Sequence, residues 1–552
     1  MSQSNQYSNK TIVIGIDSAT FDLINPWIKE GKLPVIKNLI EKGCSGVLES
    51  TIPPLSPVAW TSFLTGMNPA KHGIFDFIEP GLNDEERIVF TNRTRCRQKP
   101  LWKYLNDAGH KTVLLNIPMT YPPGKLDGCM VSGMGTPSLL DEYTYPPDLK
   151  SKLIKELGTY IIDSVGFSSH KKPDKFIKFL RKMIKNRLAA TKYLLETTEW
   201  DFFMVVFIAV DRAQHQLWKY LDPGFHGVTK EETRKYSDAI LTIYQDIDAA
   251  VGTIVQSLED NINIVIMSDH GADAVYQYIS INNWLADKGF LTYKKIHSGL
   301  FDKIVSSNLF YKIYKRFSPN KAKKPGLFFE SIDSPKTKAF FLGTRCGKIF
   351  INLKDKFPGG IVAPGQEYEE VRNEIIQELM KLEDPKTGKH IVHKVLKRED
   401  IYSGDLLSNA PDLVIELERG YTSFLPKKDL MQGVRRYRKG EVFIPSSKIS
   451  GDHTRNGIFI INSHMMNKNK TNMRAHIWDL CPTILYMMDI PIPDSMDGKV
   501  FVEGFKETYI KNRPIKYYTD VDSSSEKKMG YSYSDEESNS VKESLKNLGY
   551  LD

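Results

Sequence analysis

The sequence has few of the features that mark secreted, membrane-spanning or nucleic-acid-binding chains. Its five cysteines are an odd number without CxxC spacing, which predicts a reducing compartment and no disulfide framework. The longest apolar run, FFMVVFIAV from Phe202, is too short to cross a bilayer, and the polar start lacks the apolar stretch of a signal peptide. A net charge of +8 is too mild to indicate a nucleic-acid-binding module. We therefore expect a soluble, cytoplasmic protein.

The length of the chain predicts more than one simple core. Its 552 residues are 41% hydrophobic and 26% charged, as in globular proteins. Turn motifs such as PGG, APG and DPKTG surround a helical pattern after residue 357, which favours an inserted lobe. We expect a core in residues 1–296, an inserted cap or smaller lobe in 297–445, the rest of the core in 446–515, and a polar tail in 516–552.

Buried strands are predicted to alternate with helices. Short apolar runs without polar alternation begin at Thr11, Thr112, Phe202, Asn263 and Gly457, and helical patterns separate them. This order is typical of an α/β fold with a mostly parallel central sheet and helices on both faces. In such folds the functional residues follow the carboxyl ends of the strands.

A serine stands at the predicted start of a short helix. Ser56 is at the N-cap position, Pro57 at the first helical position, and Gly66 where the helix would end. An ordinary cap explains this pattern, so the serine alone does not establish chemistry.

Carboxylates and histidines follow the predicted strands with unusual regularity. Asp211 precedes His215 by four residues, which is one helical turn and places both on one helix face. Each such residue alone has a structural explanation as a cap, a surface pair or a turn. Together they offer the imidazole nitrogens and carboxylate oxygens that zinc prefers. The set comprises Asp17, Asp211, His215, Asp269, His270 and His453, and the last is predicted in a polar loop before the apolar run from Gly457.

These motifs resemble the alkaline phosphatase superfamily, in its branch of type I phosphodiesterases and nucleotide pyrophosphatases. The resemblance rests on GIDSAT, WTSFLTGMNPAKHGI after Ser56, DRAQH, SDHG and GDHTRNG, in that order along nearly the whole chain. It implies an alkaline phosphatase-like fold and a hydrolase of phosphodiester or pyrophosphate bonds. A small anionic phosphate ester would be the substrate.

The resemblance also implies a role for each motif residue. Asp211, His215 and His453 would hold one divalent metal ion, and Asp17, Asp269 and His270 the other. Ser56 would contact the ion at Asp17, Asp269 and His270 and act as the nucleophile, because a bound cation lowers the pKa of a hydroxyl. Zinc is the expected metal, with manganese left open by the ligand chemistry.

Departures from the family leave the substrate open. Asp76 and Phe77 occupy the neighbourhood where relatives place a phosphate-binding asparagine, which puts a nucleotide substrate in doubt. Val58 and Trp60 stand where a sulfatase of the formylglycine type needs proline and arginine. Phosphomonoesterase, phosphonate hydrolase and phosphotransferase activity remain alternatives. So does a non-catalytic protein that binds an anion or a partner on the same fold.

Basic stretches have two interpretations. The cations from Lys171 to Arg187 are predicted to form the solvated face of a helix whose apolar side holds Phe176, Leu180, Ile184 and Leu188. The alternative is a positive rim that guides an anionic substrate or contacts an anionic membrane surface. Trp60 and the aromatic residues from Phe301 to Phe317 are either a leaving-group pocket or ordinary core.

Overall fold

The structure is a computed structural model that describes residues 10–81, 88–164, 172–294, 332–423, 440–446, 449–519, 531–548 and 550. The aromatic residues from Phe301 to Phe317, and the basic residues between 312 and 324, lie outside the described residues.

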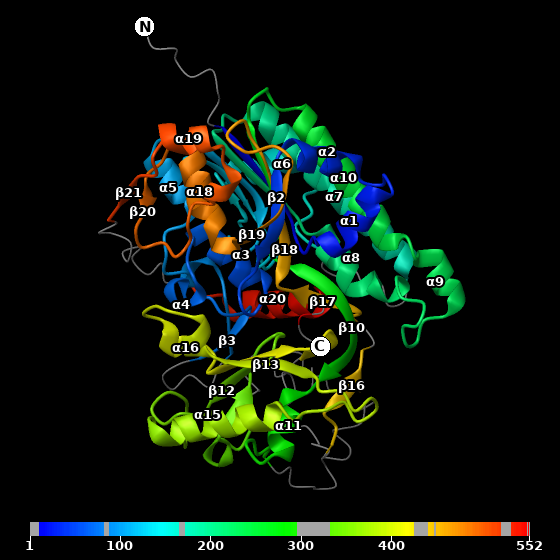
Figure 1. The fold of residues 1–552 in the computed structure, drawn as a ribbon, viewed down its shortest axis with the longest axis vertical. Helices are drawn as coiled ribbons and strands as arrows, with labels where there is room; N and C mark the ends of the chain where they lie inside the picture. Colours follow the sequence, from blue (N-terminus) through cyan, green and yellow to red (C-terminus); the bar gives the residue numbers. More distant parts are fainter. Residues whose placement is uncertain are drawn as a thin grey trace.

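A nine-stranded sheet forms the centre of the larger part of the molecule (Figure 1). Strands β9, β1, β8, β5 and β6 run parallel to one another, while β18 pairs antiparallel with β9 and β2. The predicted α/β fold with a mostly parallel sheet is confirmed. In spatial order the strands are β19 (Lys470–His476), β2 (Cys44–Glu49), β18 (Asn456–Asn462), β9 (Asn263–Met267), β1 (Thr11–Ile16), β8 (Phe202–Phe207), β5 (Thr112–Ile117), β6 (Gly128–Ser132) and β7 (Thr144–Tyr145).

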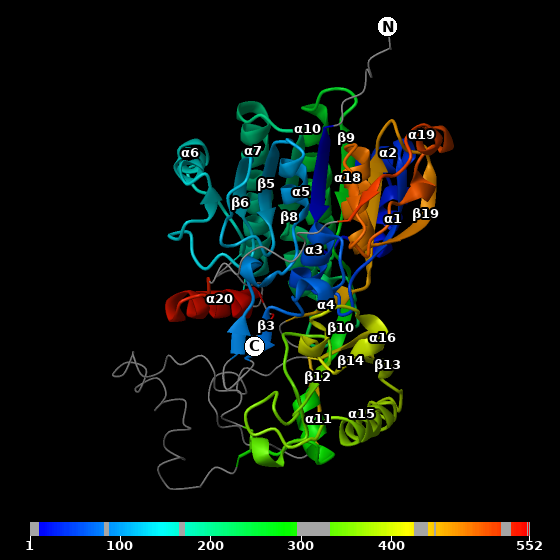
Figure 2. The ribbon, with the colours of Figure 1, turned by 90° about the vertical axis from the view of Figure 1, so that its left-hand side faces the viewer.

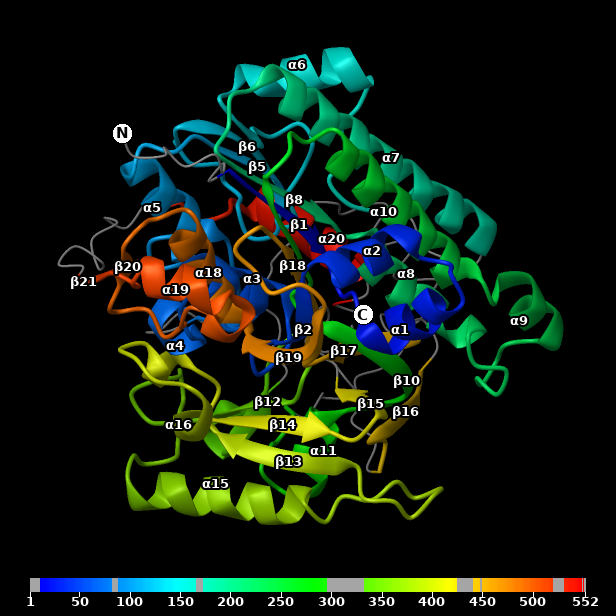
Figure 3. The same ribbon diagram turned by 45° about the horizontal axis from the view of Figure 1, so that its top comes forward.

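Helices cover both faces of this sheet (Figure 3). One layer holds α1 (Phe21–Lys29), α2 (Pro34–Lys42), α7 (Pro173–Thr197), α8 (Ala209–Leu217) and α10 (Ala239–Gln256). The other holds α3 (Ser56–Thr65), α5 (Leu101–Asp107) and α18 (Leu480–Met487). The strands are buried throughout because both faces are covered, which explains their uninterrupted apolar sequences.

A smaller antiparallel sheet lies beyond the carboxyl ends of the parallel strands (Figure 2). Its order is β11 (Ala339–Phe341), β12 (Lys348–Ile351), β14 (Leu413–Leu417) and β13 (Val392–Lys397), with α15 (Gln366–Leu379) packed on β12 and β13 and α11 (Ile281–Asp287) on β11. A further sheet pairs β10 (Gly271–Ile279) with β15 (Gly420–Ser423), β16 (Phe443–Pro445) and β17 (Gly451–Thr454). The boundaries predicted for the inserted lobe stay a prediction.

Helix α20 (Asp535–Leu548) crosses between the large and small sheets (Figures 1 and 2). Its buried residues Val541, Leu545 and Leu548 join the apolar cluster that fills the smaller lobe. The region predicted as a polar tail therefore contains a helix with one buried apolar side.

Shorter elements complete the described chain. The helices are α4 (Pro69–His72), α6 (Asp148–Leu157), α9 (Lys230–Tyr236), α16 (Arg398–Ile401) and α19 (Glu507–Asn512), and the strands are β3 (Ile78–Pro80), β4 (Ile88–Phe90), β20 (Ile492–Pro493) and β21 (Tyr517–Tyr518). Single 3-10 turns are η1 (Arg93–Arg95), η2 (Trp218–Tyr220), η3 (Ser334–Lys336), η4 (Leu407–Asn409), η5 (Ile477–Asp479) and η6 (Val502–Gly504). In the part of the chain that the structure describes, no helix is both long enough and apolar enough to cross a membrane.

The amphipathic pattern predicted for α7 is confirmed for the described residues except at Arg187, with Leu188 partly buried, while Lys171 lies outside the described residues. Phe176, Leu180 and Ile184 are buried, and the lysines between them are exposed. Arg187 was predicted on the solvated face, but it is 1% exposed and donates to the carbonyl oxygens of Ile161 and Ile162. The helical spacing of the sequence does not show that the loop with Ile161 and Ile162 covers this part of the helix.

Candidate active site

The seven predicted site residues come together at the carboxyl end of the parallel strands. Asp17 follows β1, Asp269 and His270 join β9 to β10, and Asp211 and His215 occupy the first and last turns of α8. Ser56 opens α3. His453, predicted in a loop, lies on β17 opposite Ala272 of β10. No side chain of the seven is more than 2% exposed.

Ser56 lies beside a first trio of candidate metal ligands, which are Asp17, Asp269 and His270. Its Oγ is 3.2 Å from His270 Nε2. The same nitrogen is 3.2 Å from Asp269 Oδ2 and 3.9 Å from Asp17 Oδ1. Ser56 is the first residue of α3, and Leu55 is its N-cap, so the predicted cap role is wrong by one position. The hydroxyl thus faces the trio instead of the helix backbone, while Gly66 ends the helix in the left-handed region as predicted.

Asp211, His215 and His453 form a second trio. Asp211 Oδ1 is 3.2 Å from His215 Nε2 and 3.4 Å from His453 Nε2, and these two nitrogens are 3.0 Å apart. The predicted spacing of Asp211 and His215 on one helix is confirmed. The rings of His270 and His453 stack with centroids 3.6 Å apart, so the two trios are adjacent.

Each site carboxylate is held by one oxygen and leaves the other without a hydrogen-bond partner. The Trp60 indole donates to Asp17 Oδ2 over 3.0 Å, and the Ser18 amide donates to Asp269 Oδ1 over 3.2 Å. Arg212 Nη1 donates to Asp211 Oδ2 over 2.5 Å. The unpaired, buried atoms are Asp17 Oδ1, Asp211 Oδ1 and Asp269 Oδ2, and all three face the trios. Buried oxygens without donors are costly unless a cation satisfies them.

The three histidines point their Nε2 atoms at the same space. Nδ1 of His215, His453 and His270 lies 2.7, 2.8 and 3.0 Å from the carbonyl oxygens of Gly451, Pro54 and Gly271. A carbonyl oxygen only accepts, so Nδ1 carries the proton and Nε2 presents a lone pair. Two such lone pairs 3.0 Å apart repel each other unless a proton or a metal ion lies between them. The donor set therefore fits divalent cations of the zinc type.

The charges of the site perturb its titration in the absence of a cation. Burial and the neighbouring Asp269 raise the pKa of Asp17 well above its usual value, and burial and Asp211 raise the pKa of Asp269 to about 8. Burial and His453 lower the pKa of His270 to about 4. Burial alone would raise the pKa of Asp211, but His215 and Arg212 hold it well below its usual range. A bound cation would remove the repulsion among these carboxylates.

A turn of the smaller lobe reaches the second trio. Arg345, between β11 and β12, donates to Asp452 Oδ1 over 2.5 Å, and Thr422 donates to the other oxygen of Asp452. Asp452 neighbours His453 and lies close enough to contribute to a metal site. Because these donors occupy both of its oxygens, Asp452 is a weaker candidate ligand than Asp211.

Asp76 is bound to the same turn. Its carboxylate accepts from the amide and hydroxyl of Thr344, over 2.9 and 2.7 Å, and forms a buried ion pair with Lys348. Asp76 therefore connects the core to the smaller lobe. The structure gives this residue partners of its own at the position where the family resemblance implies an asparagine for the phosphate.

Sequence reasoning missed two residues that contact Asp211. Arg212 is 1% exposed, donates to Asp211 and forms a double hydrogen bond with Asp163. The Tyr550 hydroxyl is 3.1 Å from Arg212 Nη1 and 3.5 Å from Asp211 Oδ2. Arg212 stands inside the motif DRAQH and was open to notice. Nothing in the sequence around Tyr550 connects it to the site. Trp60 is fully buried and orients Asp17, so it does not line a pocket.

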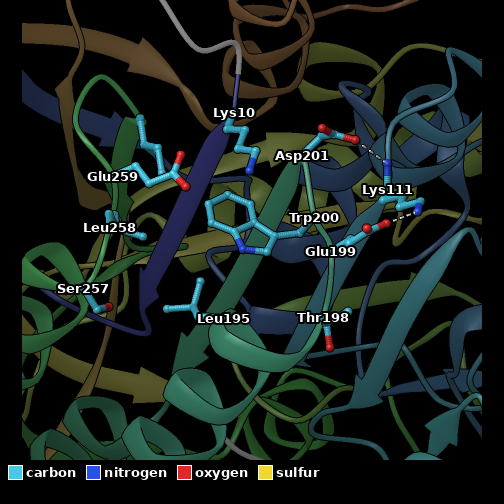
Figure 4. A pocket seen from close by; sticks show the side chains of 11 residues that line it. Lys10, Lys111, Leu195, Thr198, Glu199, Trp200, Asp201, Ser257, Leu258 and Glu259 are labelled. Carbon is cyan, nitrogen blue, oxygen red and sulfur yellow. Dashed lines mark hydrogen bonds and ion pairs between the residues drawn. The ribbon is translucent and has the colours of Figure 1, made fainter.

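A cavity of about 480 Å³ lies at the opposite end of the strands (Figure 4). Lys10, Trp200 and Glu259 are among the residues that line it, close to where β1, β8 and β9 begin. None of the seven site residues lines this cavity, and its charged residues are of both signs. It has no part in the chemistry of the site.

Comparisons with known proteins concern the family and the fold of the chain. A family model described as type I phosphodiesterase / nucleotide pyrophosphatase matches residues 11–453. No curated protein matches the chain significantly. Phosphonoacetate hydrolase from Sinorhizobium meliloti 1021 is a similar solved structure, with 14% identity, 88% of this chain and 97% of that chain covered, and a TM-score of 0.51. Human ectonucleotide pyrophosphatase / phosphodiesterase 5 has 13% identity, covers 91% of this chain and 99% of its own, and gives a TM-score of 0.47.

Proposed function

We propose that this chain, which belongs to the type I phosphodiesterase / nucleotide pyrophosphatase family of the alkaline phosphatase superfamily, is a metal-dependent hydrolase of phosphodiester or pyrophosphate bonds. Its nucleophile would be Ser56. One observation carries the proposal. Ser56 Oγ lies beside buried donors that include two carboxylate oxygens without hydrogen-bond partners.

The cofactor we propose is a pair of divalent ions. One ion would be held by Asp17, Asp269 and His270 together with Ser56. The other ion would be held by Asp211, His215 and His453. When bound, the ions would lower the pKa of the serine hydroxyl and stabilise negative charge on the departing oxygen. Nitrogen and carboxylate donors favour zinc, and manganese is the alternative.

The residues of the chain supply the remaining chemistry. Ser56 Oγ attacks phosphorus, the bond from phosphorus to the leaving oxygen breaks, and a phosphoserine forms. Water then attacks the phosphoserine, which releases the product and restores the hydroxyl. The N-terminus of α3 contributes partial positive charge next to Ser56, which suits a phosphate oxygen.

The proposal does not extend to nucleotides as the preferred substrate. A phosphate-binding amide is replaced by Asp76, whose carboxylate is committed to Thr344 and Lys348. A small anionic phosphate ester remains the proposed substrate class. Apart from the buried Arg187, the basic residues of α7 are exposed, and their contact with an anionic membrane surface stays a prediction.

The test compares two serines of the same helix. Ser56→Ala should lower the rate on bis(4-nitrophenyl) phosphate by about a thousandfold or more, because the nucleophile is lost. Ser62→Ala is the matched control, since Ser62 is equally buried but bonds to His72, away from the trios. Metal analysis should find close to two ions per chain in all three proteins.

Product analysis separates the alternatives. A panel of 4-nitrophenyl phosphate, phosphonoacetate and an added alcohol acceptor distinguishes a monoesterase, a phosphonate hydrolase and a phosphotransferase. A Ser56→Ala protein with the wild-type rate would exclude the serine mechanism. A wild-type protein that binds phosphate without turnover, and with the affinity of Ser56→Ala, would favour a non-catalytic binding protein.

A further inference from the structure

The ring of Tyr550 lies against the two histidines of the second trio. Its ring centroid is 5.6 Å from that of His215 and 5.9 Å from that of His453. Its hydroxyl lies 3.5 Å from Asp211 Oδ2 and 3.1 Å from Arg212 Nη1. The residue is 2% exposed, so it is buried along with the trio.

The ring of Tyr550 sits in a slot built by three separate segments. Phe77 packs against it with ring centroids 4.7 Å apart. The guanidinium carbons of Arg212, from α8, and Arg345, from the smaller lobe, are each 5.4 Å from the ring centroid. The slot is therefore aromatic on one side and cationic on two others. Its positive charge is largely balanced, because Arg212 pairs with Asp163 and Arg345 pairs with Asp452.

Tyr550 belongs to the same apolar cluster as α20, and its amide donates to the carbonyl oxygen of Leu545 over 2.8 Å. Val541, Leu545 and Leu548 anchor α20 in the apolar cluster of the smaller lobe. Further away, the Tyr533 hydroxyl donates to the carbonyl of Gly135 over 2.6 Å, and its ring stacks on Tyr121. Three apolar side chains of α20 therefore still pack in this cluster when the Tyr550 ring is removed.

The observed arrangement is closed to a substrate. Ser56 is 0% exposed, yet a phosphorus atom must reach its Oγ and a leaving group must depart in line on the far side. Ser56 lies beside Asp17, Asp269 and His270, so a leaving group opposite its Oγ would lie toward Asp211, His215 and His453, whose two histidine rings Tyr550 contacts.

We propose that Tyr550 is a gate on the leaving-group side of the site, and that a substrate binds by displacing its ring from the slot between Phe77 and the two arginines. The inference rests on the proposed function for the identity of the leaving group. The apparent affinity for a substrate is then reduced by the fraction of molecules in which the gate is closed. Tyr550 thereby selects for leaving groups that can take its place, and planar rings fit the vacated slot best.

The experiment removes the ring and measures access in two ways. For Tyr550→Ala we expect kcat/KM on bis(4-nitrophenyl) phosphate to rise by about tenfold or more, mainly through a lower KM. We expect a chelator such as EDTA to remove zinc from the metal-loaded protein faster by a similar factor. Tyr550→Phe keeps the ring and should behave much as the wild type. A chain that ends at Leu548 should match Tyr550→Ala.

Tyr533→Ala is the matched control, because it removes the same side chain from the same segment without opening the slot. It should leave both the kinetics and the chelation rate close to those of the wild type, with thermal unfolding recorded for every variant. The gate is wrong if Tyr550→Ala lowers kcat/KM, leaves the chelation rate unchanged, or is matched by Tyr533→Ala. If no variant hydrolyses the diester but Tyr550→Ala still speeds chelation, the gate stands and the proposed function fails.

Discussion

The substitution Trp60→Phe tests whether the orientation of Asp17 controls metal binding. Trp60 lies one helical turn after Ser56 on α3, is 0% exposed, and donates its indole N–H to Asp17 Oδ2 over 3.0 Å. Gly15 on β1 makes room for the indole, since a Cβ there would lie 2.6 Å from the Trp60 ring. Phenylalanine keeps an aromatic ring in this space but has no N–H to donate.

The loss follows from the position of Asp17. Without the indole, Oδ2 has no donor, the carboxylate is free to rotate, and Oδ1 no longer faces Asp269 and His270 reliably. Removal of a group that orients a metal ligand typically costs 10- to 100-fold in metal affinity, or about 1.4–2.7 kcal/mol. The smaller ring also lowers the free energy of unfolding by about 1–3 kcal/mol.

The assay is a competition titration of zinc between the protein and a chromophoric chelator. Trp284→Phe is the matched control: Trp284 is 2% exposed in the smaller lobe, so the volume loss is similar but no site carboxylate is involved. Trp60→Phe should weaken zinc binding while Trp284→Phe should not. Equal zinc affinity in Trp60→Phe and the wild type would refute the argument that the indole sets the carboxylate.

Two further predictions concern buried charge. Lys348→Ala should lower the free energy of unfolding in urea by about 3–5 kcal/mol, because it leaves the Asp76 carboxylate buried without its cation. Adding Asp76→Asn to the Lys348→Ala protein should restore part of the lost stability. A urea midpoint unchanged by Lys348→Ala would contradict the importance of this ion pair. The metal-free protein should lose stability as the pH rises from about 7.5 to about 8.5, a range that lies above the ordinary pKa of histidine in an unfolded chain. The reason is that burial and Asp211 raise the pKa of Asp269 to about 8 in the fold, so the unfolded chain, with an ordinary carboxyl, binds fewer protons there. Urea titrations of the metal-free protein at several pH values should show this slope, and Asp269→Asn should reduce it; the same slope in both proteins would be the contrary result.

Local patterns predicted the site because its residues follow the regular elements that predicted the fold. Asp17 and Asp269 come directly after buried parallel strands, and such strands end at one edge of a sheet. Asp211 and His215 share a helix face because four residues make about one turn. These contacts are set by periodicity, which is readable in a single sequence.

Other contacts depend on chain paths that no local pattern reports. Arg345 reaches Asp452 from a turn of the smaller lobe, and Tyr550 reaches Asp211 from beyond α20. Arg187 resembled its exposed neighbours on α7, but the carbonyls of residues 161 and 162 cover it. In each case a distant segment packs against the residue, and the sequence separation hides the encounter.

The main-chain carbonyls that fix the histidine rings have a consequence for how the site tolerates change. Gly451, Pro54 and Gly271 supply these oxygens, and a main-chain atom persists whatever side chain a mutation introduces. Point substitutions among the neighbours can thus accumulate without turning the imidazoles. Insertions or deletions that displace the backbone near β17 or before α3 would be far more damaging, so the alignment of the rings is robust to drift in composition and fragile to change in loop length.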